Sequence, residues 1–348
     1  MSARQQAGMD EKKARAATIF DVARLAGVSH QTVSRVLNDL PNVRASTRQR
    51  VEVAIKQLRY VPSPAARALV TRRSRTIGLI MAGIPDFGPS STMLGFNEAA
   101  RAERYAVSMA NLLESDTASV RAAVDMLLRQ NVEAIVLIAE RLGALDAVQN
   151  FELGVPLLTV DAAGRQGIHS VSIDQYRGAR AAVEHLISLG HTRILHLAGP
   201  TDSMDAVERS RGWRDALADA GLIAQEPVVG DWTPNSGYAA GRLLGARADF
   251  TAVFASNDQM ALGLIHGLAD HGLHVPADVS VVGFDDIPEA EHFTPPLTTV
   301  RQDFATLGRK IMSSLLDLLN ELDGAQSQQD VPELVVRAST GAPAQHRS

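Results

Sequence analysis

The sequence contains no cysteine, which excludes disulfide bonds, thiolate metal sites and a cysteine nucleophile. Aromatic residues make up only 4% of the 348 residues. Long apolar runs are also missing: no stretch of about 18 apolar residues occurs, so we expect no membrane-spanning helix. Residues 1–17 are charged and lack the apolar segment of a secretory signal, so we expect a cytoplasmic protein.

Charge is distributed unevenly along the chain. Residues 1–75 contain 15 Lys and Arg against 5 Asp and Glu, a net charge of +10, whereas residues 76–348 carry a net charge of −15. A basic module joined to an acidic body is typical of a protein in which one part binds a polyanion such as nucleic acid. A solvated, disordered basic tail is the alternative, and it accounts only for residues 1–16.

Residues 18–38 predict two short helices joined by a tight turn. Thr18 and Asp21 have the spacing of a capping box, and Ser29 can cap the second helix. Gly27 suits the turn because it lacks a Cβ atom. The predicted apolar faces comprise Val22, Leu25 and Ala26 in the first helix, and Val33, Val36 and Leu37 in the second.

The outer face of the second helix is polar and carries no acidic residue. Such a helix can lie in the DNA major groove, where Gln31 can read adenine and Arg35 can read guanine. Two ordinary surface helices are the alternative reading. The outward-facing residues are His30, Gln31, Ser34, Arg35 and Asn38.

The string AGVSHQTVSRVLN at residues 26–38 resembles the DNA-binding head of the lactose-repressor (LacI) family, which runs A-G-V-S-x-x-T-V-S-R-V-[LIV]-N. The resemblance implies a helix-turn-helix head, over residues 17–62, that binds double-stranded DNA at a palindromic operator. His30 stands where the type member of the family has a tyrosine, so we expect a different operator. The implied DNA contacts are Thr18, Ser29, His30, Gln31, Thr32, Ser34, Arg35 and Asn38.

A third helix is predicted at residues 45–58, with Val51, Ile55 and Leu58 on the face that closes a three-helix core. Arginines flank and enter this helix. They fit contacts with DNA phosphates and fit a solvated helix face equally well. These residues are Arg44, Arg48 and Arg50.

Residues 63–75 predict a short helix and a basic tether. Ser63 suits the N-cap and Pro64 the first helical position, but the helix is too short to be stable alone in water. A plain linker is one reading. The resemblance implies instead a hinge helix that pairs with its copy in a dimer and folds on DNA, with Leu69 as a minor-groove wedge and Ala66 on the same face.

From residue 76 onward, short apolar runs alternate with amphipathic helices, which predicts doubly wound parallel sheets. Strands are predicted at 77–81, 106–110, 134–138, 157–160, 171–173, 194–197, 252–255 and 279–284. Helices are predicted at 119–129, 177–189, 205–220, 237–244, 259–271 and 307–322. The resemblance implies a periplasmic-binding-protein-like body of two α/β subdomains, 76–173 with 302–331 and 174–301 with 332–341, followed by a tail at 342–348.

Parallel sheets bind ligands beyond the carboxyl ends of their strands. Carboxylates, an amide, an arginine and aromatic rings that follow the predicted strands suit a polyhydroxylated ligand, and neither a G-x-G-x-x-G motif nor a P-loop occurs. We therefore expect no bound cofactor. Such carboxylates also cap helices, and Asp258 and Asp286 are the strongest candidates for that role. The strand-end candidates are Asp86, Asp161, Arg209, Trp232, Asn257, Asp285 and Phe304.

The segments LAGP (197–200), SNDQMALG (256–263), DVSVVGFDD (278–286) and PPLTTVRQDFATLG (295–308) resemble the effector domain of the same family. The loop at 83–91 departs from the type member, because it is rich in Gly and Pro and places Asp86 in an apolar position, so the sugar is expected to differ. By matching position, the implied effector contacts are Asp161, Arg209, Trp232, Asn257, Asp285, Gln302 and Phe304.

The sequence therefore predicts a DNA-binding repressor, released from its operator by a sugar or glycoside inducer. The resemblance also implies a homodimer, because the terminal leucine heptad that makes the type member of the family a tetramer does not follow residue 336. A co-repressor-dependent regulator that binds a purine and a sugar-binding transport protein remain alternatives. An enzyme is the third, because several histidines occur, although none lies in a catalytic motif. These are His185, His191, His196, His271 and His274.

Overall fold

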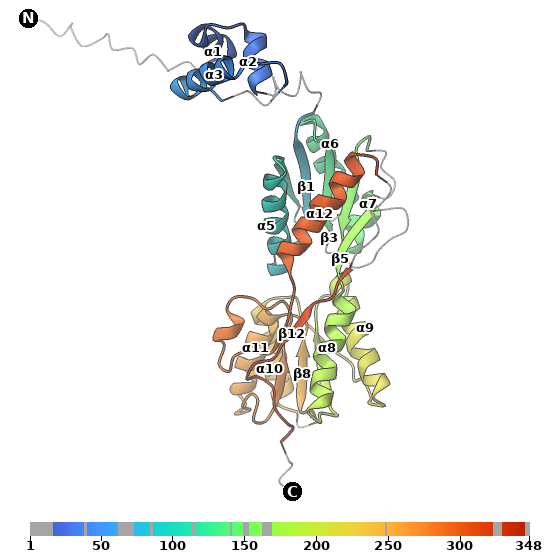
Figure 1. Ribbon diagram of the computed structural model, residues 1–348. Helices are drawn as coiled ribbons and strands as arrows, with labels where there is room; N and C mark the ends of the chain where they lie inside the picture. Colours follow the sequence, from blue (N-terminus) through green and yellow to red (C-terminus); the bar gives the residue numbers. More distant parts are fainter. Residues whose placement is uncertain are drawn as a thin grey trace, which may run out of the picture. The chain divides into compact units, whose positions relative to one another are not determined.

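The computed structural model divides into two compact units, Met1–Ser74 and Arg75–Ser348, hereafter the head and the body (Figure 1). Of the predicted features, the basic tail, Asn38, and the hinge helix with Ala66 and Leu69 lie outside the described residues. The structure describes residues 17–37, 40–61, 73–83, 86–112, 116–139, 141–148, 153–161, 169–247, 249–322 and 329–344.

The head consists of three helices, α1 (Ile19–Ala26), α2 (His30–Leu37) and α3 (Ala45–Leu58). The capping box predicted at Thr18 and Asp21 is confirmed, because both of its hydrogen bonds are present. Gly27 ends α1 in the left-handed region at φ 65°. The Ser29 hydroxyl accepts from the Thr32 amide at 3.2 Å, which caps α2 as predicted.

Val22, Val33 and Val51, one from each helix, are fully buried and form the centre of the head. The prediction that Leu25 belongs to this core is wrong, since its side chain is 50% exposed. Helix α1 instead packs through Ala23 and Ala26, whose small side chains allow close approach to its neighbours.

The first sheet of the body is parallel and has the strand order β11-β5-β4-β3-β1-β2. Its helices α5 and α12 cover one face, and α6 and α7 cover the other. Ile77, Leu79 and Met81 of β1 pack on the first helix pair, and Ile80 packs on the second, so both sides of this strand are apolar. The bounds are β1 (Thr76–Ala82), β2 (Ala106–Leu112), β3 (Ala134–Ala139), β4 (Leu157–Val160), β5 (His169–Ile173), β11 (Gln329–Asp330), α5 (Phe87–Ala102), α6 (Thr117–Arg129), α7 (Leu142–Val148) and α12 (Phe304–Leu319).

The second sheet is also parallel, with the order β7-β6-β8-β9, and lies between the pairs α8/α9 and α10/α11. Two further strands, β10 (Thr299–Arg301) and β12 (Glu333–Val335), pair antiparallel. The remaining bounds are β6 (Ile194–Ala198), β7 (Val228–Val229), β8 (Ala252–Ala255), β9 (Ser280–Val282), α8 (Gln175–Ser188), α9 (Met204–Asp219), α10 (Pro234–Gly245), α11 (Asp258–Ala269) and a 3-10 turn, η1 (Ala290–His292).

The chain passes between the two sheets three times, from β5 to α8, from β10 to α12 and from β11 to β12. Figure 1 shows β12 and the segment that precedes α12 between the two layered halves. We keep residues 174, 302 and 332 as the proposed subdomain boundaries and call the halves the first and second subdomains.

The predicted α/β fold class with a small helical head is confirmed, and all eight predicted strands are present. The prediction of a loop at residues 83–91 is wrong from residue 87 onward, because α5 begins at Phe87. Its first turn contains Gly88 and Pro89, and proline is tolerated there because those backbone amides have no intrahelical partner. The last helix begins at Phe304 rather than residue 307, because the Asp303 carboxylate caps it through the Thr306 amide.

Gly95 of α5 and Gly308 of α12 allow these two helices to pack closely. A Cβ atom added to Gly95 would lie 2.4 Å from the Phe304 carbonyl oxygen. We expect Gly95→Ala to lower the free energy of unfolding by about 1–3 kcal/mol through overpacking. Urea unfolding followed by circular dichroism measures this change.

Gly88→Ala in the same helix is the matched control, because its added Cβ would meet nothing closer than 3.9 Å. Alanine ordinarily stabilises a helix relative to glycine, so the control should be neutral or slightly more stable. Equal changes in the free energy of unfolding for the two variants would contradict the close contact between Gly95 and α12.

Candidate functional site

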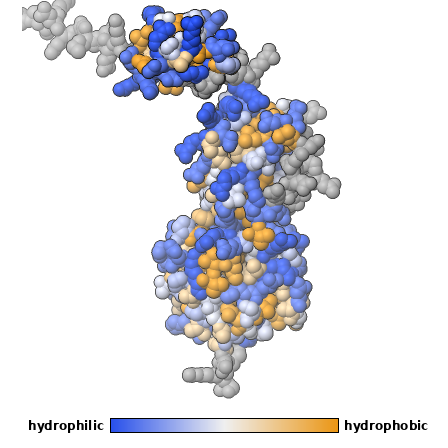
Figure 2. Space-filling model, in the orientation of Figure 1, coloured by the Kyte–Doolittle hydropathy of each residue, from blue (hydrophilic) through white to orange (hydrophobic). Residues whose placement is uncertain are grey.

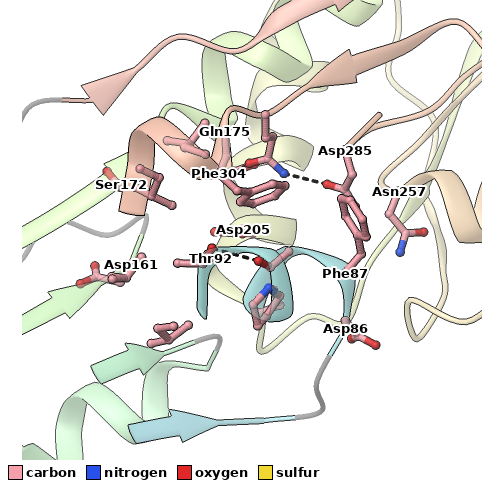
Figure 3. A pocket seen from close by; sticks show the side chains of 18 of the residues that line it. Asp86, Phe87, Thr92, Asp161, Ser172, Gln175, Asp205, Asn257, Asp285 and Phe304 are labelled. Carbon is pink, nitrogen blue, oxygen red and sulfur yellow. Dashed lines mark hydrogen bonds between the residues drawn. The ribbon is translucent and has the colours of Figure 1, made fainter. Parts of the chain in front are cut away.

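A cavity lies between the two subdomains, beyond the carboxyl ends of the strands (Figure 3). It contains about 740 Å³ of atom-free space, including the part open to solvent. The structure brings all eight effector candidates to this cavity. They are Asp86, Asp161, Arg209, Trp232, Asn257, Asp285, Gln302 and Phe304.

The candidates come from both subdomains. Asp161 directly follows β4, and Asn257 and Asp285 follow β8 and β9 after short loops. Asp86, Asp161 and Ser172 belong to the first subdomain and Asn257 and Asp285 to the second, and Figure 3 shows these side chains around the cavity. Groups that bind a ligand at both sides would therefore hold the two subdomains together.

Four buried side chains form a closed ring of three hydrogen bonds and one ion pair at the cavity, and we call it the Arg209 ring. Arg209 Nε donates to Gln175 Oε1 at 2.9 Å, and Gln175 Nε2 donates to Gln302 Oε1 at 2.9 Å. Gln302 Nε2 donates to Asp285 Oδ1 at 2.7 Å, and Arg209 Nη2 lies 3.4 Å from the same oxygen. Gln175 and Gln302 stand on two of the connections between the subdomains, so the ring joins the site to those connections.

Asp285 is the acidic member of this ring. Its burial raises the pKa to about 6, and the Arg209 guanidinium opposes that rise. The residue has φ 108°, which is unusual for a side chain with a Cβ atom. Its backbone amide donates to the Val300 carbonyl at 2.8 Å, which helps to hold this conformation.

Aromatic rings line the cavity from both subdomains. Phe87 and Phe304 meet edge to face, with centroids 5.8 Å apart. Trp232 is only 8% exposed, and the Arg209 guanidinium carbon lies 5.5 Å from its ring. Gly199 makes room for the indole, because a Cβ atom there would lie 2.3 Å from the ring.

The prediction that Asp258 and Asp286 are helix caps is wrong. Asn257 caps α11 instead, and its amide nitrogen donates to the Trp232 carbonyl at 3.0 Å. Asp258 is fully buried and accepts from the Thr299 hydroxyl at 2.6 Å. Asp286 forms ion pairs with two arginines, at 2.6 Å with Arg301 and 2.7 Å with Arg337.

Sequence reasoning missed several residues of the cavity. Asp205 lies one helical turn before Arg209, with its carboxylate 3.8 Å from the guanidinium, and burial raises its pKa. The i,i+4 spacing on α9 is a signal that points to it. Gln175 carries no such signal. The others include Phe87, Thr92, Ser172 and Ser203.

The buried histidines have structural partners. His191 contacts the hydroxyls of Thr251 and Ser280 at 2.9 and 3.0 Å, and His196 stacks between Trp213 and Phe254. Within the described ranges, no group of three or more His, Cys, Asp or Glu side chains is placed to hold a metal ion. Of the helices that the structure describes, none has the length and apolar character needed to cross a membrane.

In the head, His30, Gln31 and Arg35 are exposed on α2. The rings of His30 and Phe20 lie 5.2 Å apart. Thr18, Ser29 and Thr32 take part in the caps of α1 and α2, and Ser34 is half-buried. The flanking arginines differ, because Arg44 and Arg50 are exposed whereas Arg48 reaches the Val36 carbonyl at 3.5 Å.

Two family models match the chain. The model of bacterial regulatory proteins of the lacI family matches residues 18–63, and that of a periplasmic binding protein-like domain matches residues 183–340. The chain is 36% identical over 330 residues to the lactose operon repressor of Escherichia coli (strain K12), covering 94% of this chain and 91% of that protein. The chain belongs to the LacI family of bacterial regulatory proteins.

Other LacI-family proteins are similar to this chain over most of its length. The transcriptional regulator CelR of Thermobifida fusca is 38% identical, with 88% of this chain and 93% of CelR covered. The repressor PurR of Haemophilus influenzae (strain PittEE) is 34% identical, with 93% and 98% covered. These relatives are transcriptional regulators, and this chain is a DNA-binding transcriptional regulator.

Solved structures of LacI-family proteins share the fold over most of the chain. The lac repressor dimer bound to operator and the anti-inducer ONPF superposes with a TM-score of 0.85 at 34% identity, covering 94% of this chain and all of that chain. The CelR–cellobiose complex has a TM-score of 0.68 at 34% identity and covers 93% and 99%.

A substitution at Gln175 tests how much the Arg209 ring contributes to the free energy of unfolding. Gln175→Leu leaves Arg209 Nε and Gln302 Oε1 without their partner. We expect the free energy of unfolding to fall by about 1–3 kcal/mol, the usual effect of an unsatisfied buried polar group. Gln130→Leu, directly after α6, is the control because it removes only an exposed hydrogen bond with the Ser108 hydroxyl. A loss no larger than that of the control would contradict the ring's importance.

Asp285 makes stability depend on pH in an unusual direction. Its pKa is about 6 in the folded protein, against about 3.9 in an unfolded chain. Between these values the folded protein binds the extra proton, so the stability contributed by protonated Asp285 is present near pH 4 and is lost as the pH rises through about 6.

We therefore expect the wild type to lose, relative to Asp285→Asn, on the order of 1–3 kcal/mol of unfolding free energy between about pH 4 and pH 7. Urea titrations of both proteins over that range measure the difference, and groups that do not interact with Asp285 cancel between them, whereas Asp258, which the Asp285 charge affects, contributes to it. A difference that does not change with pH would refute the assignment.

Proposed function

We propose that this protein is a transcriptional repressor that binds a palindromic operator as a homodimer and is released by a sugar or glycoside inducer. The observation that carries the sugar assignment is the composition of the cavity. Four carboxyl groups and a ring of amide and guanidinium groups provide paired hydrogen bonds for vicinal hydroxyls, and aromatic faces cover apolar sugar surfaces. The four carboxyl groups belong to Asp86, Asp161, Asp205 and Asp285.

Charge argues against an acidic effector. Arg209 is the only Lys or Arg side chain among the described residues that line the cavity, and its donors already face Gln175, Asp285 and Asp205. A phosphate or carboxylate would be desolvated beside several acidic groups with no free cation to pair with. An uncharged polyol avoids this penalty.

The cavity provides a physical route from effector to DNA. It is lined by both subdomains, and Phe87 of the first subdomain packs on the core of the second. We propose that an effector held at both sides moves the subdomains relative to each other and so changes the pairing of the hinge helices. Operator must then weaken effector binding by the same factor, because the coupling is reciprocal.

For DNA binding, we propose that α2 lies in the major groove with His30, Gln31 and Arg35 toward the bases. We propose that Thr18, Ser29, Thr32 and Ser34 contact the DNA backbone beside those bases. Asn38, Ala66 and Leu69 remain proposed contacts outside the described residues. A protein that acts on operator DNA works at the chromosome, so we place it in the cytoplasm, at the nucleoid.

A homodimer suits a palindromic operator, since protein and site then share a two-fold axis. Solved structures of a relative are of a dimer bound to operator. The body also exposes apolar side chains on neighbouring helices, with Leu243 of α10 59% exposed and Leu262 of α11 44% exposed. Figure 2 shows apolar side chains gathered at the surface of this part of the body.

The competing functions receive less support. A relative named PurR keeps a co-repressor-dependent mechanism open, and the sign of the ligand effect distinguishes it from induction. A transport protein does not explain the basic head. We propose no enzymatic activity, because the two buried histidines are taken up by structural contacts.

Fluorescence anisotropy with a labelled palindromic operator from upstream of the protein's own gene tests the proposal. Tight, salt-dependent binding that one sugar releases is the expected result. Binding that requires an added purine would favour the co-repressor mechanism, and no DNA binding under any condition would refute the proposal.

The same assay tests the recognition helix. We expect Arg35→Ala to weaken operator binding by about 1–3 kcal/mol, the value of one bidentate base contact, and to relax specificity at one position. Arg129→Ala, at the exposed end of α6 in the body, makes the same chemical change and should leave binding unchanged. Equal effects of the two variants would remove Arg35 from the proposed contacts.

A further inference from the structure

Two residues that line the same cavity each have a buried polar atom without a hydrogen-bond partner in the described part of the chain. The two atoms are Asp86 Oδ2 and Trp232 Nε1. Buried polar atoms are almost always paired in native proteins, so each exception calls for an explanation. Both atoms belong to residues that line the cavity, and an effector is the simplest common partner.

Asp86 occupies the N-cap position of α5 but does not cap it. Asp116, Asp174 and Asp303 hold the same position before α6, α8 and α12, and each accepts a hydrogen bond from a backbone amide of its helix. The Asp86 carboxylate makes no such bond. A capping bond contributes about 1 kcal/mol, so the side chain forgoes that stabilisation while one of its oxygens is buried without a partner.

The indole of Trp232 is held firmly with its nitrogen unpaired. Its side chain is 8% exposed and stands against Gly199, where no side chain could fit. Its backbone has φ 72° and is tied by the Asn257 amide at 3.0 Å. The indole N–H is only a donor, so it requires an acceptor.

Asp86 belongs to the first subdomain and Trp232 to the second. Both residues line the same cavity, and the negative charge of Asp231, the residue before Trp232, acts on the Asp86 carboxyl. This charge and burial together raise the pKa of Asp86, burial being the larger cause. A ligand group that satisfies both atoms would therefore connect the two subdomains.

Resting on the proposed function, we propose that Asp86 and Trp232 form a hydroxyl-binding subsite that bridges the two subdomains and selects an uncharged disaccharide as the effector. A hydroxyl group both donates and accepts, so hydroxyls satisfy the carboxylate and the indole N–H together. An ammonium has donors only and leaves Trp232 Nε1 unpaired. A carboxylate or phosphate has acceptors only and meets Asp86 with like charge.

The proposed subsite requires more than a single sugar ring. The Arg209 ring, Asp161 and Asp205 supply the partners for one set of vicinal hydroxyls, and Asp86 and Trp232 need further hydroxyls, which a second sugar unit carries. An alkyl group has no polar atom for either residue, and the nitro group of a nitrophenyl glycoside has acceptors only. Both groups would leave the buried Asp86 oxygen without a donor, which weakens binding.

Isothermal titration calorimetry on the full chain tests this subsite. The ligands are cellobiose, lactose and maltose, and the methyl and o-nitrophenyl glycosides of glucose and galactose. We expect one disaccharide to bind at least tenfold more tightly than the glycosides of its first sugar. Asp86→Leu should lower the affinity for that disaccharide about 10–100-fold and change the affinity for the methyl glycoside less than twofold.

Two variants separate the contributions of the pair. Asp86→Asn keeps an acceptor oxygen and should lose less affinity than Asp86→Leu. Trp232→Phe keeps an aromatic ring without its N–H and should show the same selective loss for the disaccharide. Asp125→Asn, on the exposed face of α6, is the matched control and should bind all ligands like the wild type.

The possible failures are distinguishable. If nitrophenyl glycosides bind as tightly as the disaccharide and Asp86→Leu binds within twofold of the wild type, the subsite is wrong while the sugar-responsive function stands. Glucosamine is added to the titrations as the ammonium-bearing comparison, and if it binds more tightly than every disaccharide, the hydroxyl assignment is wrong. If the folded wild type binds operator but none of the sugars, both the subsite and the proposed function are overturned.

Discussion

The buried guanidinium of Arg209 is the constraint on which the arrangement of the site depends. Only 4% of this residue is exposed, and an arginine that far from water is tolerable only if its charge and donors are matched. Asp285 supplies the charge, while Gln175 and the Ser256 carbonyl accept hydrogen bonds. Asp285 follows β9, Gln175 follows β5 and Ser256 follows β8. The requirement to pair one buried cation therefore fixes the positions of these strand ends and of the connection at Gln175 relative to one another.

The Arg209 ring also explains how a small ligand can affect the whole body. Gln175 and Gln302 stand where the chain passes between subdomains, so a ligand that competes for a hydrogen bond of the ring acts directly on those connections. Because each member both orients and satisfies its neighbour, the site is preorganised and little ordering is left for binding to supply. A full two-state reversal still needs about 5.5 kcal/mol of differential affinity, which several hydrogen bonds across the cleft can provide.

Local patterns in the sequence predicted local structure well, as the caps at Thr18 and Ser29 and the turn at Gly27 show. They failed where distant contacts decide. Leu25 continues an apolar stripe but lies on a face that no neighbour covers, and Gln175 gives no sign that it meets Gln302 across 127 residues. Asp258 resembles a cap, yet the Thr299 hydroxyl from β10 keeps it in the core. Parallel topology explains why the seven strand-end candidates share one cavity, but it does not determine their hydrogen-bond partners.

The residues that line the cavity differ in function between the two subdomains. The second subdomain and the connections carry the Arg209 ring, where any change leaves a buried charge or amide unpaired. The first subdomain presents Asp86 and Phe87 at the start of α5, and the close contact of Gly95 with α12 holds that helix in place independently of the ring. The side chain at position 86 caps nothing in its own helix, so its chemistry is free to match a ligand. In the proposed mechanism, ligand identity is thus set at a position where substitution costs the fold little, and coupling to DNA is set where substitution costs it much.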